Sequence, residues 1–274
     1  MSFMKLFLVG AFACLAIYLF ATAPAKLPES NIQTSAQATE TASKLFNTVN
    51  AINEAARFIY TKKIVGEGKK VGLKFGEDWN EPGVEKGPLP ALFLRLVAKH
   101  LEKRPEPLGL YLGSDEPINK SNLFSKDQLS QFQDVKQTLK PQYVLVDEGR
   151  STAMYPDFAS VDACVTCHNE HADSPKTDWA LNDVMGATTW TYPARTVSQS
   201  QLVSVSQALY QSVADAYRDY LAKAATFAAP VSATANWPGN SVQTLPDVKT
   251  FMQAVLQQAG PSIAEEILVP NILE

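Results

Sequence analysis

The sequence lacks the features that identify several large classes of protein. Its 24 Lys and Arg and 28 Asp and Glu give a formal net charge of −4 without a basic cluster, which argues against a nucleic-acid-binding surface. No Ser-His-Asp set, glycine-rich phosphate loop or pair of carboxylates stands out, so none of these catalytic sites is predicted. The composition, 46% hydrophobic and 19% charged, is that of a globular protein with a buried core.

Long apolar runs are absent except at the start of the chain. Met1 to Lys5 carries one positive charge, and Leu6 to Ala23 is an uncharged run of 18 residues. Ala23 and Ala25 have the spacing that a signal peptidase reads, and Pro24 favours a cut after Ala25. The run is also near the shortest that spans a bilayer, so residues 1–25 are interpreted as either a signal peptide or a membrane anchor. In both cases we expect the remaining chain to be exported to the periplasm, soluble or tethered.

Cysteine is scarce, with three residues in 274, and only Cys164 and Cys167 lie beyond the first twenty positions. They form a C-x-x-C-H motif with His168. Two cysteines three positions apart project from one side of a helical turn, where their sulfurs reach the two vinyl groups of a haem. The adjacent histidine then offers a nitrogen to the iron. The motif therefore predicts one covalently attached haem c, with His168 as the proximal iron ligand.

Three other interpretations of the two cysteines remain open at this point. A structural zinc site would need His168 and His171 as further ligands, and the adjacent Cys167 and His168 make a tetrahedron from one short loop awkward. A thiol–disulfide oxidoreductase normally places Cys-x-x-Cys at the start of a helix in a βαβ unit, whereas the strands here look antiparallel. A plain disulfide across two intervening residues would close a very small loop and stabilise little.

The hydrophobic pattern predicts an α+β fold with long helices at both ends. A heptad-like seam predicts a helix over about residues 35–62, packed either on its own domain or against a second copy. Helix and strand signals alternate over about residues 66–196, and the simplest arrangement is one antiparallel sheet with helices on one side. An amphipathic helix follows from Ser198, and a last helix begins near Asp247 and is interrupted at Gly260 and Pro261. The seam residues are Ala38, Ala42, Leu45, Val49, Ile52, Ala56 and Ile59.

The segments LPALFLRLVAKHLEK, LGLYLGSDEPINKSNLFSKDQLSQFQDV and ACVTCHNEHADSPKTDWALNDVMGATTWTYP together resemble a bacterial family of exported PAS-like sensory domains that carry c-type haem. The family includes a cyanobacterial soluble haem protein and the input domains of some histidine kinases and chemoreceptors. The resemblance covers about residues 40–196. It implies a five-stranded antiparallel sheet with a long N-terminal helix and a haem against the sheet. The expected organisation is a PAS-like haem domain over 35–196 and a helical C-terminal extension over 197–274.

A second axial ligand to the iron is not identified by the motif. Met154 precedes the cysteines by ten residues on an expected strand, and Met185 follows them before a glycine. Met154 is slightly favoured between these two, and water or an empty position is the alternative. His100 and His171 are poorer candidates, because the first is expected on an exposed helix face and the second is tethered beside His168. Some relatives use a cysteine thiolate, and this chain has no third cysteine after its N-terminal run.

These features favour an exported haem c protein that senses redox state or a diatomic gas. The alternative is a periplasmic mono-haem electron carrier, which would hold the iron between two strong ligands. We expect no enzymatic activity, since a peroxidase needs a distal acid–base group over the iron. The heptad-like helices suggest a homodimer or a docking surface for a membrane signalling partner.

Overall fold

The computed structural model describes residues 39–146, 149–229, 231–237 and 243–268. The predicted signal peptide or membrane anchor at residues 1–25 lies outside these ranges. Helices and antiparallel strands both occur, which confirms the α+β class. Among the described helices, none combines the length and the apolar character needed to cross a bilayer.

The first long helix follows the predicted apolar seam. A short strand, β1 (Thr39–Thr41), leads into α2 (Ala42–Ile59), which passes without a break into a π-helical segment, η1 (Tyr60–Gly66), and a last turn, α3 (Glu67–Lys70). The seam residues from Ala42 to Ile59 are all buried in the main hydrophobic core of the chain. Because this face is covered by the chain's own helices, any dimer would have to use another surface.

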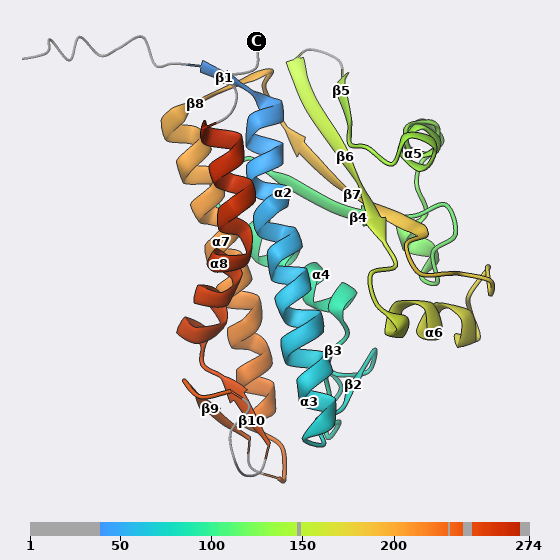
Figure 1. The fold of residues 1–274 in the computed structure, drawn as a ribbon, viewed down its shortest axis with the longest axis vertical. Coiled ribbons are helices and arrows are strands. Elements are labelled where there is room, and N and C mark those ends of the chain that lie inside the picture. Colours follow the sequence, from blue (N-terminus) through green and yellow to red (C-terminus); the bar gives the residue numbers. More distant parts are fainter. Residues whose placement is uncertain (1–38, 147–148, 230, 238–242, 269–274) are drawn as a thin grey trace, which may run out of the picture. The chain divides into compact units, whose positions relative to one another are not determined.

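The helices after residue 196 belong to the same core as α2. α7 (Gln199–Ala224) and α8 (Val248–Leu268) pack beside α2, and α7 also packs along α4 (Pro90–Leu101) (Figure 1). Two stacked ring pairs, Tyr60 with Phe93 and Tyr217 with Phe251, lie in this helical layer, each with ring centroids 4.1 Å apart. The expected C-terminal extension therefore packs as an integral part of the described unit.

α8 corrects one detail of the sequence analysis, because the helix continues through Gly260 and Pro261 instead of being interrupted there. A proline removes one backbone donor, and a helix that packs well elsewhere can tolerate that loss. α7 begins as predicted, at a capping box in which Ser198 and Gln201 satisfy each other's backbone N–H groups.

The main sheet has four antiparallel strands rather than the expected five. Their order is β4 (Gly109–Gly113), β7 (Val184–Tyr192), β6 (Arg150–Phe158) and β5 (Gln142–Val146). The other described strands form two-stranded pairs: β1 with β8 (Thr196–Ser198), β2 (Phe75–Gly76) with β3 (Gly87–Pro88), and β9 (Ser232–Thr234) with β10 (Thr244–Pro246). These strands are two or three residues long, and none is hydrogen-bonded to the main sheet.

Helices cover both faces of this sheet, which corrects the expectation of helices on one side. Ala153, Tyr155 and Trp190 face α2 and join the main core. Met154 and Ala187 face the other way, toward α5 (Lys126–Thr138), in a second cluster with Phe132 (Figure 1). α5 starts at a capping box formed by Ser125 and Gln128, and a short 3₁₀ turn, η2 (Lys120–Asn122), precedes it. β6 and β7 therefore contribute alternate residues to two separate cores.

Candidate functional site

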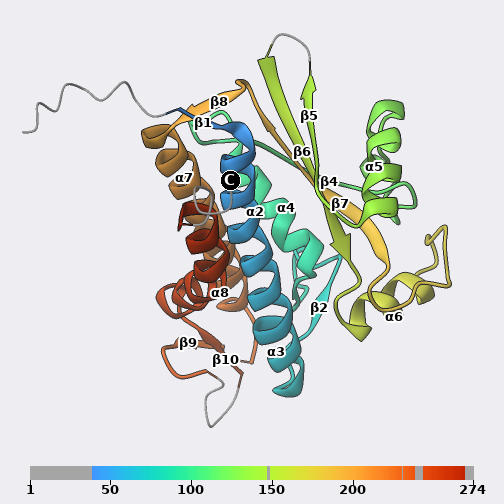
Figure 2. The same ribbon diagram turned by 45° about the horizontal axis from the view of Figure 1, so that its top comes forward.

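All three residues of the C-x-x-C-H motif lie on α6 (Asp162–Glu170), at one end of the main sheet (Figure 2). The helix follows β6 and precedes β7, and no residue of α6 is buried. Cys164 is half-buried, Cys167 is exposed, and both thiols are free. Because the two cysteines are three positions apart on a helix, both sulfurs belong to one accessible face.

His168 lies one helical turn after Cys164 and is half-buried. Its ring meets the indole of Trp179 edge to face, with centroids 6.4 Å apart and an interplanar angle of 86°. The Nδ1 atom of His168 is buried without a hydrogen-bond partner among the described residues. Burial lowers the pKa of His168, and the nearby His171 lowers it further. The imidazole is therefore kept neutral, which is the form that binds a metal.

The loop after α6 is closed by one asparagine. Asn169 Nδ2 donates a 3.0 Å hydrogen bond to the backbone oxygen of Trp179, and the Trp179 N–H donates a 2.8 Å bond to Asn169 Oδ1. The ammonium of Lys176 lies 4.7 Å from the centre of the Trp179 ring and pairs with Asp178. These contacts fix the indole against His168, so the neighbour of the histidine comes from the loop and not from the helix.

The residues of α6 fit a covalently attached haem. Such a group requires two free thiols on one open face and a neutral imidazole beside them, and α6 presents both. The Nδ1 atom of His168 has no hydrogen-bond partner among the described residues, so the ring is held in place by packing against Trp179. Cys164 and Cys167 would hold the porphyrin, and His168 would ligate its iron.

Two of the alternative interpretations find no support in this geometry. In the described part of the chain, no three His, Cys, Asp or Glu residues converge as a metal site would require. α6 connects β6 to β7, which pair antiparallel, whereas the helix of a βαβ unit joins parallel strands. The fold therefore lacks, at α6, the βαβ unit in which a thiol–disulfide oxidoreductase normally carries its two cysteines.

The two candidate methionines have different surroundings. Met154 is fully buried under α5, in the cluster that also contains Phe124, Phe132 and Val135. Met185 is half-buried at the start of β7, and its backbone oxygen accepts a 2.6 Å hydrogen bond from Ser114 Oγ. The packing of Met154 accounts for its burial without any metal, and a methionine sixth ligand stays a prediction.

The other two histidines have partners of their own. His100 Nε2 lies 2.7 Å from Asp219 on α7, far along the chain from α6. His171 Nδ1 accepts a 3.1 Å hydrogen bond from the Asp173 N–H, and its Nε2 is 3.8 Å from Glu77. A hollow of about 320 Å³ lies beside Trp179, between the end of α5 and the loop before β7.

Sequence reasoning missed the roles of Asn169 and of the polar side chains along α2. Trp179 belongs to a segment that carried the family resemblance, but its contact with His168 could not be derived from spacing. Asn169 gave no signal, because an asparagine near a helix end usually caps a local turn.

The comparisons with known proteins give one family. The sequence model of the Tll0287-like family matches residues 31–193, a range that contains the main sheet, α2 and α6. No curated protein and no solved structure matches. The match points to a haem-associated, sensor-like domain. Because it spans more than half of the 274 residues, the chain belongs to the Tll0287-like family.

Proposed function

We propose that this protein is an exported c-type haem protein whose domain senses redox state or a diatomic gas. The observation that carries the proposal is the exposed face of α6, where two free thiols and a neutral imidazole lie together in a chain of this family. When bound, the haem would supply an iron centre that changes oxidation state and binds small ligands.

Different residues of this chain would attach the haem, ligate its iron and hold the histidine in place. Cys164 and Cys167 would hold the haem through thioether bonds, and His168 would ligate its iron. Trp179, held by Asn169, packs against the His168 ring and limits its rotation and its access to water. Burial and ring orientation of this kind adjust the reduction potential of a haem.

The first test is attachment. The full chain is expressed with a periplasmic haem-maturation system, and a pyridine haemochrome assay and intact mass are measured for the wild type and for Cys164→Ser/Cys167→Ser. We expect one covalent haem per wild-type chain and none in the double variant. A colourless wild type that is folded by circular dichroism would overturn the haem proposal.

The second test separates a sensor from an electron carrier. A sensor with an open or weakly held position changes its absorption spectrum when carbon monoxide or nitric oxide is added to the reduced protein. An electron carrier stays six-coordinate and low-spin in both oxidation states. An unchanged spectrum with either gas would move the assignment to the electron carrier. A homodimer or a membrane signalling partner is part of the sensor proposal.

A further inference from the structure

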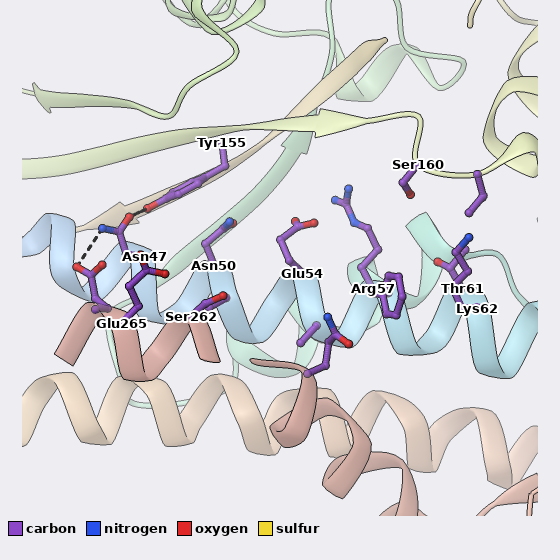
Figure 3. A pocket seen from close by; sticks show the side chains of 16 residues that line it. Asn47, Asn50, Glu54, Arg57, Thr61, Lys62, Tyr155, Ser160, Ser262 and Glu265 are labelled. Carbon is purple, nitrogen blue, oxygen red and sulfur yellow. Dashed lines mark hydrogen bonds between the residues drawn. The ribbon is translucent and has the colours of Figure 1, made fainter. Parts of the chain in front are cut away.

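A groove of about 740 Å³ runs along α2, and neither cysteine of α6 lines it. Its walls come from α2, from β6 and from α8, and it ends at Ser160 and Val161, just before α6 begins. Figure 3 shows Asn50, Glu54 and Arg57 rising from successive turns of α2 toward the strand that carries Tyr155. Three elements far apart in sequence thus bring polar groups to one concave surface, as small-molecule sites do.

One end of the groove is closed by a hydrogen-bonded network. The Tyr155 hydroxyl donates a 2.6 Å bond to Asn47 Oδ1, and Asn47 Nδ2 donates a 3.0 Å bond to Glu266 Oε1 (Figure 3). Burial raises the pKa of Tyr155, so its hydroxyl keeps its proton and remains a donor. The network joins β6, α2 and α8 and gives the groove a fixed wall.

Asn50 presents a hydrogen-bond donor to the groove. Its side-chain oxygen accepts a 3.0 Å bond from Trp190 Nε1. An indole nitrogen can only donate, so the oxygen of Asn50 must face Trp190 and its NH₂ group must point the other way. Asn50 is only 9% exposed and lines the groove, yet this NH₂ group has no partner among the described residues. The NH₂ group is therefore a free donor at the surface of the groove, where a ligand or water can accept a hydrogen bond from it.

Glu54 presents an unpaired negative charge one turn further along α2. It lines the groove and forms no hydrogen bond or ion pair with any residue in the described ranges. The nearby guanidinium of Arg57 is already engaged by Asp157 and by Thr188 Oγ1, the latter at 3.3 Å. Glu265 adds a second carboxylate from α8. Lys62, on η1, adds one positive charge to the lining, and the two carboxylates of Glu54 and Glu265 outnumber it, so the groove favours a cation.

We propose that this groove binds a small organic ammonium compound that carries an oxygen acceptor next to its amine, as an amino alcohol does. Glu54 accepts hydrogen bonds from the ammonium, and the NH₂ group of Asn50 donates to the oxygen. The two side chains are four residues apart on one helix, so they lie on the same face about 6 Å apart. A metal ion is not the occupant, since the described carboxylates do not gather in threes. The proposal does not rest on haem attachment.

The test measures amine binding directly. The full, matured chain is dialysed to equilibrium against radiolabelled ethanolamine at constant pH and salt, and ethylamine and acetate are used as competitors. Glu54→Gln removes the charge, and Asn50→Asp keeps the acceptor for Trp190 but replaces the donor by an oxygen. Glu102→Gln makes the same charge change at an exposed position outside the groove. Circular dichroism confirms that each variant is folded.

The expected pattern distinguishes the two contacts. Wild type and Glu102→Gln bind ethanolamine alike, and Glu54→Gln binds it about tenfold more weakly, as expected for a lost charged hydrogen bond. Ethylamine competes about threefold less well than ethanolamine in the wild type, and this preference disappears in Asn50→Asp. Binding that persists in the haem-free Cys164→Ser/Cys167→Ser variant shows that the groove acts independently of the haem. Unchanged binding in Glu54→Gln, competition by acetate but not by ethylamine, or no saturable binding by the wild type would overturn the proposal.

Discussion

Asn169 holds the backbone of Trp179 at both of its polar atoms, donating to the oxygen at 3.0 Å and accepting from the N–H at 2.8 Å. Through this pair of hydrogen bonds a residue of α6 positions the ring of Trp179. The consequence is that the surroundings of His168 depend on a residue with no metal-binding role of its own.

Asn169→Ala should therefore loosen the loop and change the haem without removing it. We expect a loss of about 1–3 kcal/mol in unfolding free energy, because the backbone groups of Trp179 lose their partners. In the haem-loaded protein the reduction potential should shift, since the indole no longer packs in one orientation on His168. Asn169→Asp keeps the acceptor and loses the donor, so its effects should be smaller. A potential identical to the wild type in both variants would show that Asn169 has only a structural role.

His168 on α6 and His171 at the C-terminal cap of α6 can be compared by substituting each with alanine. His168→Ala should abolish the ligation signature in the absorption spectrum while the thioether bonds remain, because Cys164 and Cys167 are unchanged. His171→Ala should leave the spectrum as it is, since its ring faces Asp173 and Glu77. The absorption spectra of the two purified variants test this assignment. An altered spectrum in His171→Ala would contradict His168 as the iron ligand.

Met154 is expected to act through packing. Met154→Leu keeps the volume and should cost less than about 1.5 kcal/mol, whereas Met154→Ala should cost about 2–5 kcal/mol by leaving a cavity under α5. Urea unfolding measures both values. The absorption spectra of Met154→Leu and Met185→Leu test ligation separately. A spectral change in Met154→Leu but not in Met185→Leu would identify Met154 as the sixth iron ligand.

Two ion pairs on long helices allow a comparison of buried and exposed contacts. Arg57 is 16% exposed and ties α2 to β6 through Asp157 and to β7 through Thr188. Arg57→Ala should cost about 2–4 kcal/mol, because it leaves Asp157 partly buried without its partner. Arg218 is 57% exposed and pairs with Asp215 three residues away, so Arg218→Ala should cost less than about 0.5 kcal/mol. Equal losses in chemical unfolding would contradict this ranking.

Two glycines should respond in opposite directions to the same added methyl group. A Cβ at Gly87 would lie 2.6 Å from the ring of Tyr220 and 2.8 Å from Phe75, so Gly87→Ala should destabilise the protein by about 1–3 kcal/mol. A Cβ at Gly260 in α8 would meet nothing within 4 Å, and alanine is the better helix former. Gly260→Ala should add about 0.5–1 kcal/mol. The two thermal unfolding midpoints should move to opposite sides of the wild-type value.

Local patterns determined much of what the sequence predicted correctly. The period of the α2 seam, the start of α7 at Ser198 and the α+β class all follow from contacts within one or two helical turns, or from the alternation of elements. The C-x-x-C-H motif is of the same kind, because five consecutive residues carry its chemistry. Such features survive without knowledge of the fold, since helix and strand geometry are the same everywhere.

Only the tertiary structure decided which distant residues meet. It showed four strands in the main sheet, helices on both of its faces, and Met154 on the α5 side away from α2. It also joined Asn50 to Trp190, 140 residues apart, and thereby exposed a donor in a groove beside Glu54. These outcomes depend on strand order and on how helices pack, which arise from the balance of the whole core and leave no mark in the spacing of neighbouring residues.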